Sequence, residues 1–175
     1  APFRGVRFDP RFISDLAAVT SPPYDVIEPD RVPMLETADP HNVVRLILPR
    51  EDVADGRGRY RHAAKALARW LADGLLAADP DPGLYVYEQV TATSVQRGLI
   101  GALGLRPPDQ RVILPHEDHM PGPVADRLEL MRAAQANLEP ILLSYEGGGP
   151  ASHAVEAAIR QPPLISIVTP DRVRH

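Results

Sequence analysis

The sequence contains no cysteine, which excludes disulfide bonds and thiolate chemistry. It has no apolar run near the ~20 residues that a membrane-spanning helix needs. Its N-terminus lacks the basic and then apolar segment of a secretory signal. These absences predict a cytoplasmic protein that has no membrane partner.

The sequence also lacks an excess of positive charge. Its formal net charge is −4 and its isoelectric point is about 5.8. A chain of this balance has no general attraction to a polyanion, so we expect no nucleic-acid partner and only local roles for the arginines.

Proline is abundant instead, with 20 residues in a chain of 175, and 44% of the residues are hydrophobic. This composition supports a globular core built from short elements that rigid turns connect. We predict a single α+β domain over residues 1–175, either complete or the N-terminal part of a longer protein, with a glycine-rich linker at 146–150.

The hydrophobic periodicity predicts a mixed, partly antiparallel sheet with flanking helices. Helices are expected at residues 29–37, 60–72, 127–137 and 152–160, with a helical turn reaching residue 18. Strands are expected at residues 3–8, 43–48, 84–90, 95–105, 111–114 and 164–168, with an exit strand at 141–145.

Residues 114–145 form the segment that is richest in reactive side chains. Pro115 and Pro121 bracket a polar cluster that contains His116 and Glu117, the two predicted catalytic acid–base residues. Histidines four apart on a helix would indicate zinc, but His116 and His119 are three apart in a predicted loop, so no metal site is expected.

The helix expected after this loop carries the predicted anion-binding residues. Asp126 stands at the expected N-cap, and Arg127 and Arg132 follow it on the helix. Arginine forks suit carboxylates and phosphates. Alternatively, Asp126 only caps the helix and Arg132 only pairs with Glu129, three residues earlier.

Three further ligand-binding candidates lie in the first half of the chain. Two prolines precede Tyr24 and Asp25, so a stiff turn either aims these side chains at a ligand or makes a surface corner. Arg45 interrupts an apolar run, where it must face solvent, find an acidic partner or bind a ligand.

Two glycine patterns suggest nucleotide binding, and both are weak. Gly98, Gly101 and Gly104 lie in a strand-like run, so they do not open a helix as a dinucleotide fingerprint does. The glycines at 147–149 precede a helix and could cradle phosphate, but no Lys-Ser/Thr pair follows them, which favours a linker.

Several segments together resemble the N-terminal part of a prokaryotic family called "domain of unknown function 1015". They are SPPYDVI at 21–27, NVVRLILP at 42–49, LYVYEQ at 84–89, RGLIGAL at 97–103, LPHE at 114–117, DRLELMRA at 126–133 and ANLEPI at 136–141. Asn42 and Asn137, which lie in these segments, complete the set of predicted ligand-binding residues.

The resemblance implies more than the residues show by themselves. Typical members are longer and continue into an Asp-Gly-His-His-Arg-Tyr motif, similar to one in the ParB and sulfiredoxin-like superfamily, which includes a free-serine kinase. It implies a phosphoryl-transfer or nucleotide site, with a nucleotide and Mg²⁺ as cofactors. This chain departs from the family pattern at Val124, where a lysine is expected, and at Ala134, where a threonine is expected.

Two functional hypotheses follow, and a purely structural role is the third reading. The first is a phosphotransferase or phosphate-ligand enzyme for a serine-type or nucleotide substrate, in which His116 or Glu117 is the acid–base group and Arg45, Arg127 and Arg132 hold the anion. The alternative is a non-catalytic module that binds a nucleotide or metabolite. In both, the partner is a small anionic molecule and the oligomeric state is open. We expect His116 and Glu117 to share an open cleft with Arg127 or Arg132.

Overall fold

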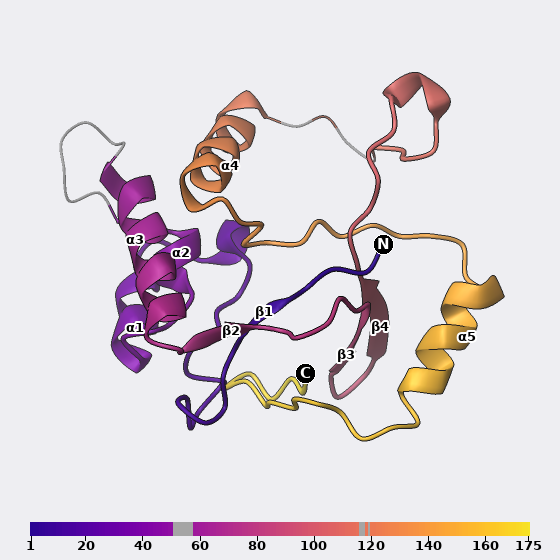
Figure 1. Cartoon of the computed structure of the whole chain (residues 1–175), viewed down its shortest axis with the longest axis horizontal. Coiled ribbons are helices and arrows are strands. Elements are labelled where there is room, and N and C mark those ends of the chain that lie inside the picture. The colour runs from indigo at the N-terminus through magenta and orange to yellow at the C-terminus, as the bar shows by residue number, and fades with distance from the viewer. Residues whose placement is uncertain (51–57, 116–117, 119) are drawn as a thin grey trace.

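The computed structural model describes residues 1–50, 58–115, 118 and 120–175, and it has the predicted α+β class (Figure 1). In chain order its elements are β1 (Val6–Phe8), the 3-10 turn η1 (Tyr24–Val26), α1 (Val32–Ala38), α2 (Val44–Ile47), α3 (Gly58–Ala72), β2 (Leu76–Ala78), β3 (Tyr85–Val90), β4 (Val95–Ile100), the 3-10 turn η2 (Pro108–Gln110), α4 (Pro121–Ala134) and α5 (Gly149–Ala158). No helix in these ranges is both long enough and apolar enough to cross a membrane.

The strands form two separate antiparallel pairs within the described ranges. β1 pairs with β2, with Arg7 opposite Ala77 at the centre. β3 and β4 form the expected hairpin, in which Val90 is opposite Val95 and the turn at 91–94 is closed by a hydrogen bond from the Thr91 amide to the Ser94 carbonyl. In Figure 1 the hairpin lies between the first pair and α5.

The longest helix, α3, confirms the prediction for residues 60–72 and organises the core. Its alanine-rich sequence favours a helix, and Ala63, Leu67 and Trp70 recur at helical spacing on its buried face. The helix is followed by Gly74, whose φ of 76° suits glycine after a C-terminus.

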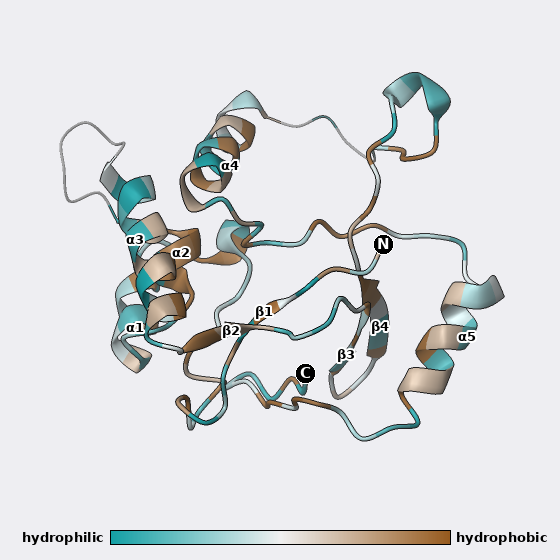
Figure 2. Cartoon of the chain, in the orientation of Figure 1, coloured by the Kyte–Doolittle hydropathy of each residue, from teal (hydrophilic) through white to brown (hydrophobic). Residues whose placement is uncertain are grey.

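The hydrophobic core lies among α1, α2, α3, α4 and the β1–β2 pair. One cluster contains Leu46, Leu67, Trp70 and Leu76, and a second contains Ile27, Val44 and Ile47. Leu138 packs against both clusters, so the two are continuous. Burying each such side chain contributes about 1.5–3 kcal/mol before the entropy cost of folding. Figure 2 shows α2, at the centre of this region, as mostly hydrophobic.

The strand predicted at residues 43–48 is wrong, because Val44–Ile47 forms the short helix α2. Its apolar residues are consecutive or nearly so, and all are buried. Because such a run has no clear period, the sequence does not distinguish a buried strand from a buried helix. Three other expected strands are also not strands here. Residues 111–114 bend, 141–145 pair with no strand, and Val168 makes only an isolated bridge with Arg174. Residues 10–18 form turns, of which one is helical, with a hydrogen bond from the Ile13 amide to the Asp9 carbonyl, but it does not continue to residue 18.

A partly buried tyrosine hydroxyl joins the two strand pairs. The Tyr85 hydroxyl donates to Asp79 and accepts a 2.7 Å hydrogen bond from the Gly5 amide. Arg7 donates to the same carboxylate from β1. A Cβ atom on Gly5 would lie 2.8 Å from the tyrosine oxygen, so this close approach needs a glycine.

Candidate functional site

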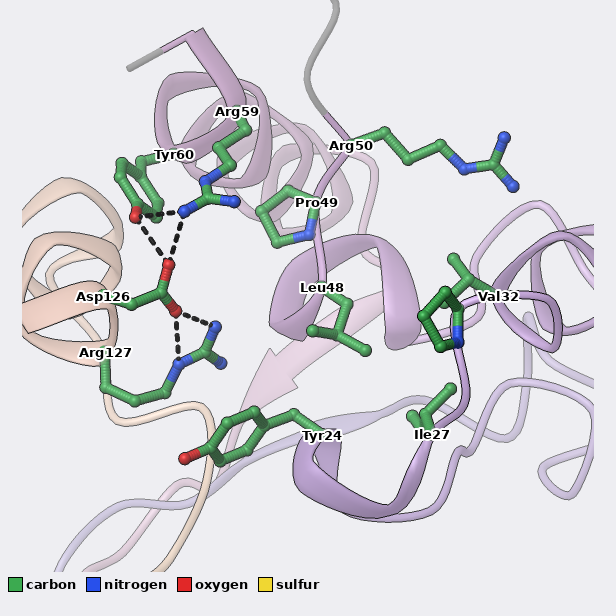
Figure 3. Close-up of a pocket in the computed structure, with 11 residues that line it drawn as sticks. Tyr24, Ile27, Val32, Leu48, Pro49, Arg50, Arg59, Tyr60, Asp126 and Arg127 are labelled. Carbon is green, nitrogen blue, oxygen red and sulfur yellow. Dashed lines mark hydrogen bonds and ion pairs between the residues drawn. The ribbon is translucent and has the colours of Figure 1, made fainter. Parts of the chain in front are cut away.

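A cavity of about 340 Å³ opens beside the helical core, and it is the candidate site (Figure 3). Its walls come from η1 and the residues that follow it, the start of α1, the segment after α2, the first turn of α3 and the middle of α4. The lining residues are Tyr24, Ile27, Pro29, Val32, Leu48, Pro49, Arg50, Arg59, Tyr60, Asp126 and Arg127.

Helix α4 places Asp126 and Arg127 differently from the prediction. The helix begins at Pro121, so Asp126 lies within it and is not its N-cap, which is Met120. Proline is tolerated in the first helical turn because the amide that it lacks has no helical partner there. Leu130 is 2% exposed, so this face of α4 is fixed in the interior. Packing of α4 against α3 brings Asp126 opposite the first turn of α3.

The carboxylate of Asp126 is the point on which the polar side chains converge. Its Oδ1 accepts 2.6 Å hydrogen bonds from the Tyr60 hydroxyl and from Nη2 of Arg59. Its Oδ2 accepts a 2.9 Å hydrogen bond from Nε of Arg127 and another from Nη2 of the same side chain. Figure 3 shows these groups facing one another on one side of the cavity.

The protonation of this group follows from its surroundings. Burial raises the pKa of Asp126. Hydrogen bonds from Tyr60 and Arg127 and the charges of both arginines lower it by more, so the pKa is below its ordinary value. Burial and the hydrogen bond to Asp126 raise the pKa of Tyr60. At neutral pH the site therefore contains a carboxylate, a neutral phenol and two guanidinium groups.

Arg127 connects four segments of the chain. Besides Asp126, its Nη1 donates to the Ile47 carbonyl at 2.7 Å and to Glu139 at 3.1 Å. Its guanidinium carbon lies 4.2 Å from the centre of the Tyr24 ring, in a cation–π contact. Glu139 also accepts a hydrogen bond from the Tyr24 amide at 3.2 Å. Arg127 is thus fixed from several sides.

The opposite wall of the cavity is apolar. It is formed by Ile27, Pro29, Val32, Leu48 and Pro49, and the close-up shows the labelled members of this set facing the polar wall. The site is therefore bipartite, with a charged wall and an apolar wall across one space.

Each of the three lining arginines has an acidic partner. Arg59 contacts Asp126 and Arg127 contacts both Asp126 and Glu139. Arg50 lies at the rim, where its guanidinium turns away from Asp126 and pairs with Glu36 at 2.5 Å. The lining alone carries three positive charges and one negative charge. Glu139 pairs with Arg127 from behind, and Glu36 is shared between Arg50 and Arg45.

The structure brings three of the predicted residues, Tyr24, Asp126 and Arg127, into this cavity. Asp25 and Asn137 are exposed and do not line it. Arg132 is also exposed and pairs with Glu129 at 2.9 Å, as the structural alternative expects.

Two other predicted residues make contacts behind the cavity. Asn42 is buried, and its amide donates to the carbonyls of Ala18 and Thr20 at 2.8 and 2.7 Å, while its oxygen accepts from the Val44 amide. Arg45 donates to the Glu36 carbonyl at 3.0 Å. Asn42 thus holds the turn at 18–20 beside α2, and Arg45 joins α2 to the last turns of α1.

The two predicted catalytic residues, His116 and Glu117, lie outside the described residues. The expected cleft that they share with Arg127 or Arg132 thus stays a prediction. The cavity itself is lined by Arg127 and not by Arg132.

Comparison with known proteins identifies the family. The sequence pattern of the family described as "Protein of unknown function (DUF1015)" matches residues 1–175. The chain belongs to this family. No curated protein and no solved structure matches this DUF1015 chain.

Sequence reasoning missed Arg59 and Tyr60, which supply half of the polar wall of the DUF1015 site. Tyr60 is the first residue of the helix expected at 60–72, and Arg59 directly precedes that range. The local signal was an arginine and a tyrosine directly after Gly58, in the first turn of a helix. The apolar wall gave no such signal.

The Mg²⁺ that the resemblance implies does not fit the described part of this DUF1015 chain. Nowhere in the described ranges do three His, Asp or Glu side chains lie together. Both oxygens of Asp126 already accept hydrogen bonds from guanidinium groups, whose positive charges would repel a cation. No metal-dependent step is derived from these residues.

Proposed function

We propose that this DUF1015 chain binds a small phosphorylated metabolite in the cavity between η1, α3 and α4, as the ligand site of a phosphotransferase. One observation carries the proposal. Donors from two helices, Arg59 and Tyr60 on α3 and Arg127 on α4, converge on a single acidic group at the wall of an open cavity. Arginine forks and a phenol hydroxyl are groups that bind phosphate oxygens.

The two walls suggest the form of the ligand. An anionic group would lie at the polar wall, and an apolar or planar group would pack against Leu48, Ile27 and Val32. The volume of about 340 Å³ is near the lower end of the ~300–1,000 Å³ typical of ligand pockets. A nucleotide has this combination of parts, and a serine-type phosphate has the anionic part alone. Both are ligands that the ParB and sulfiredoxin-like resemblance implies. Such metabolites are cytoplasmic, and the cysteine-free sequence suits that location.

The catalytic half of the proposal depends on the segment before α4. Phosphoryl transfer requires mainly positioning and charge neutralisation, which the arginines supply, together with a group that takes the proton of the attacking hydroxyl. His116 or Glu117 is proposed for that step. Asp126 suits it poorly, because its lowered pKa makes it a weak base.

A non-catalytic binding module is the second candidate. It is favoured by the contacts of Arg127, whose guanidinium is fixed to Asp126, Glu139 and the Ile47 carbonyl and is thus a rigid part of the wall. Turnover separates the two candidates. A phosphotransferase consumes ATP with a hydroxyl acceptor such as serine and loses this activity in His116→Ala or Glu117→Ala, whereas a binding module shows affinity and no turnover.

Calorimetric titration of the full chain tests the binding that both candidates share. The ligands are phosphoserine, ADP and ATP, with serine and adenosine as analogues that lack phosphate. Arg59→Gln should weaken binding of the phosphorylated ligands at least tenfold, because a hydrogen bond to a charged group contributes about 1.5–3 kcal/mol. Arg69→Gln is the matched control, since Arg69 lies on the same helix with its side chain 81% exposed. Equal affinities of these two variants, or no binding of any phosphorylated ligand, would contradict the proposal.

A further inference from the structure

We propose that Asp126 is an internal competitor for the anion subsite, so that an anion binds there with useful affinity only when it uses the donors better than this carboxylate does. This inference rests on the proposed function and names the ligand class that the same site prefers. The Asp126 carboxylate accepts hydrogen bonds from Arg59, Tyr60 and Arg127, the same groups that would hold a phosphate. A ligand anion and this side chain cannot use those donors together.

The pairing of Asp126 with Arg127 is one that an α-helix does not favour. Side chains at consecutive positions point about 100° apart around the helix axis, so neighbours of this kind do not normally face each other. Here both side chains turn toward the cavity and meet there (Figure 3). The position of the Asp126 carboxylate thus depends on the donors at this wall. Another anion can take its place when its oxygens accept hydrogen bonds from the same donors.

The donors on α4 stay in place without Asp126. Arg127 is independently held by the Ile47 carbonyl, by Glu139 and by the face of Tyr24. The Asp126 side chain is 27% exposed, so it has a path to solvent when it leaves the donors. If Asp126 were a positioning residue, Arg127 would depend on it for its place. Arg127 has three other contacts that hold it, so Asp126 acts as a competitor for the donors.

The single charge of Asp126 sets the threshold that a ligand anion has to exceed. A phosphate monoester carries about −1.5 to −2 charges at neutral pH and offers three acceptor oxygens. It therefore gains more from two guanidinium groups and a phenol than a carboxylate does. A singly charged carboxylate ligand would replace the Asp126 carboxylate with a group of the same charge and would gain no binding energy from the exchange. The site should accept phosphorylated ligands and reject simple carboxylic acids.

NMR titration of the full chain with inorganic phosphate and with acetate at pH 8 tests this inference. The side-chain Nε–H signals of Arg59 and Arg127 report on the subsite. Phosphate should bind the natural chain much more tightly than acetate. Asp126→Asn should strengthen the binding of both anions by a similar factor, about fivefold, because an internal competitor lowers the affinity of every ligand for its donors by the fraction of time that it occupies them. Asp73→Asn, at an exposed acid on the chain after α3, is the control and should leave both affinities unchanged.

The outcomes separate the inference from the proposed function. If Asp126→Asn binds phosphate more weakly than the natural chain, Asp126 positions the donors and the inference fails while the binding function stands. If neither protein binds phosphate at these arginines, the proposed function fails and takes the inference with it.

A measurement on the natural chain covers the case in which the variant does not fold. The carboxyl ¹³C signal of Asp126 should move at the same phosphate concentrations as the Arg127 signal, because the carboxylate leaves its donors when phosphate binds. An Asp126 signal that stays constant while Arg59 and Arg127 respond would overturn the inference.

Discussion

At the scale of single residues, Asp79 is the group that couples the two strand pairs. It accepts hydrogen bonds from Arg7 on β1 and from Tyr85 on β3. The hydrogen bond from Arg7, followed by that from Tyr85, lowers the pKa of Asp79 below its ordinary value of 3.8. The hydrogen bond to Asp79, together with burial, raises the pKa of Tyr85. The folded state thus favours the ionised carboxylate beside a neutral phenol.

This coupling predicts a pH-dependent stability. Because the folded pKa of Asp79 is depressed, its ionised form stabilises the fold above about pH 4, and this stabilisation is lost as the pH falls through the folded pKa. Asp79→Asn should lower the free energy of unfolding at pH 7 by about 1–2 kcal/mol. The difference between variant and natural chain should shrink as the pH falls from 5 toward 2. Urea unfolding at each pH measures it.

The control for this prediction is Asp73→Asn. Asp73 makes an exposed ion pair with Arg69 four residues earlier, at 3.3 Å. Exposed pairs of this kind contribute little to stability, so the variant should follow the natural chain at every pH. A difference for Asp79→Asn that stays constant down to pH 2 would show that the charge of this group is not the stabilising feature.

The same scale shows what the sequence could reveal about the site. Asp126 and Arg127 could be selected because charged residues that gather on one predicted helix next to prolines are visible locally. Their partners Arg59 and Tyr60 could not be selected in this way, because they are 67 and 66 residues away from Asp126 in the sequence. That pairing depends on how α3 packs against α4, which local patterns do not encode.

At the scale of elements, α4 links the core to the site. Leu130 is its most buried residue, and Ala134 packs against the cluster around Trp70. Asp126 lies four residues before Leu130, about one helical turn away. The packing of Leu130 in the interior therefore fixes the position of Asp126 relative to α3. The site therefore depends on helix packing as well as on its own hydrogen bonds.

A pair of leucine truncations on α4 tests this dependence. Leu130→Ala should lower the free energy of unfolding by about 2–4 kcal/mol, because it leaves a cavity in a packed interior. Leu128→Ala, on the same helix but 42% exposed, should change it by less than about 1 kcal/mol. Urea unfolding followed by circular dichroism gives both values. Equal effects of the two substitutions would mean that α4 is not docked through Leu130.

The elements also show which signals in the sequence are reliable. The helix α3 and the β3–β4 hairpin have clear periodicity and could be predicted, since one face of each pattern is apolar. The apolar segment 43–48 could not be assigned correctly, because contacts with residues outside it decide whether it forms a strand or a helix. Asn42, whose side chain bonds the Val44 amide at 3.0 Å, starts a helical turn there. The start of α4 was placed too late, since Pro121 was taken as the end of a loop, whereas it is the first residue of the helix.

At the scale of the whole molecule, the apolar surface is unevenly distributed. More than half of the large apolar side chains that are exposed in the described ranges lie between residues 103 and 145. They are Leu103, Leu105, Val112, Leu114, Met120, Val124, Leu128, Met131, Ile141, Leu142, Leu143 and Tyr145. Figure 2 shows hydrophobic colour along the extended chain after α4.

This distribution predicts strong binding of the dye 8-anilinonaphthalene-1-sulfonate to the natively folded chain, because the dye fluoresces on exposed apolar surface. Leu105 and Leu142 are 93% and 94% exposed, so the double substitution Leu105→Ser and Leu142→Ser should reduce the fluorescence. It should change the free energy of unfolding by no more than about 0.5 kcal/mol, since neither side chain packs in the core. Met34→Ser on α1, 68% exposed and outside the 103–145 segment, should leave the fluorescence unchanged. If the double variant bound the dye as strongly as Met34→Ser, the dye would report on another surface, and the apolar side chains of 103–145 would have to be covered in solution.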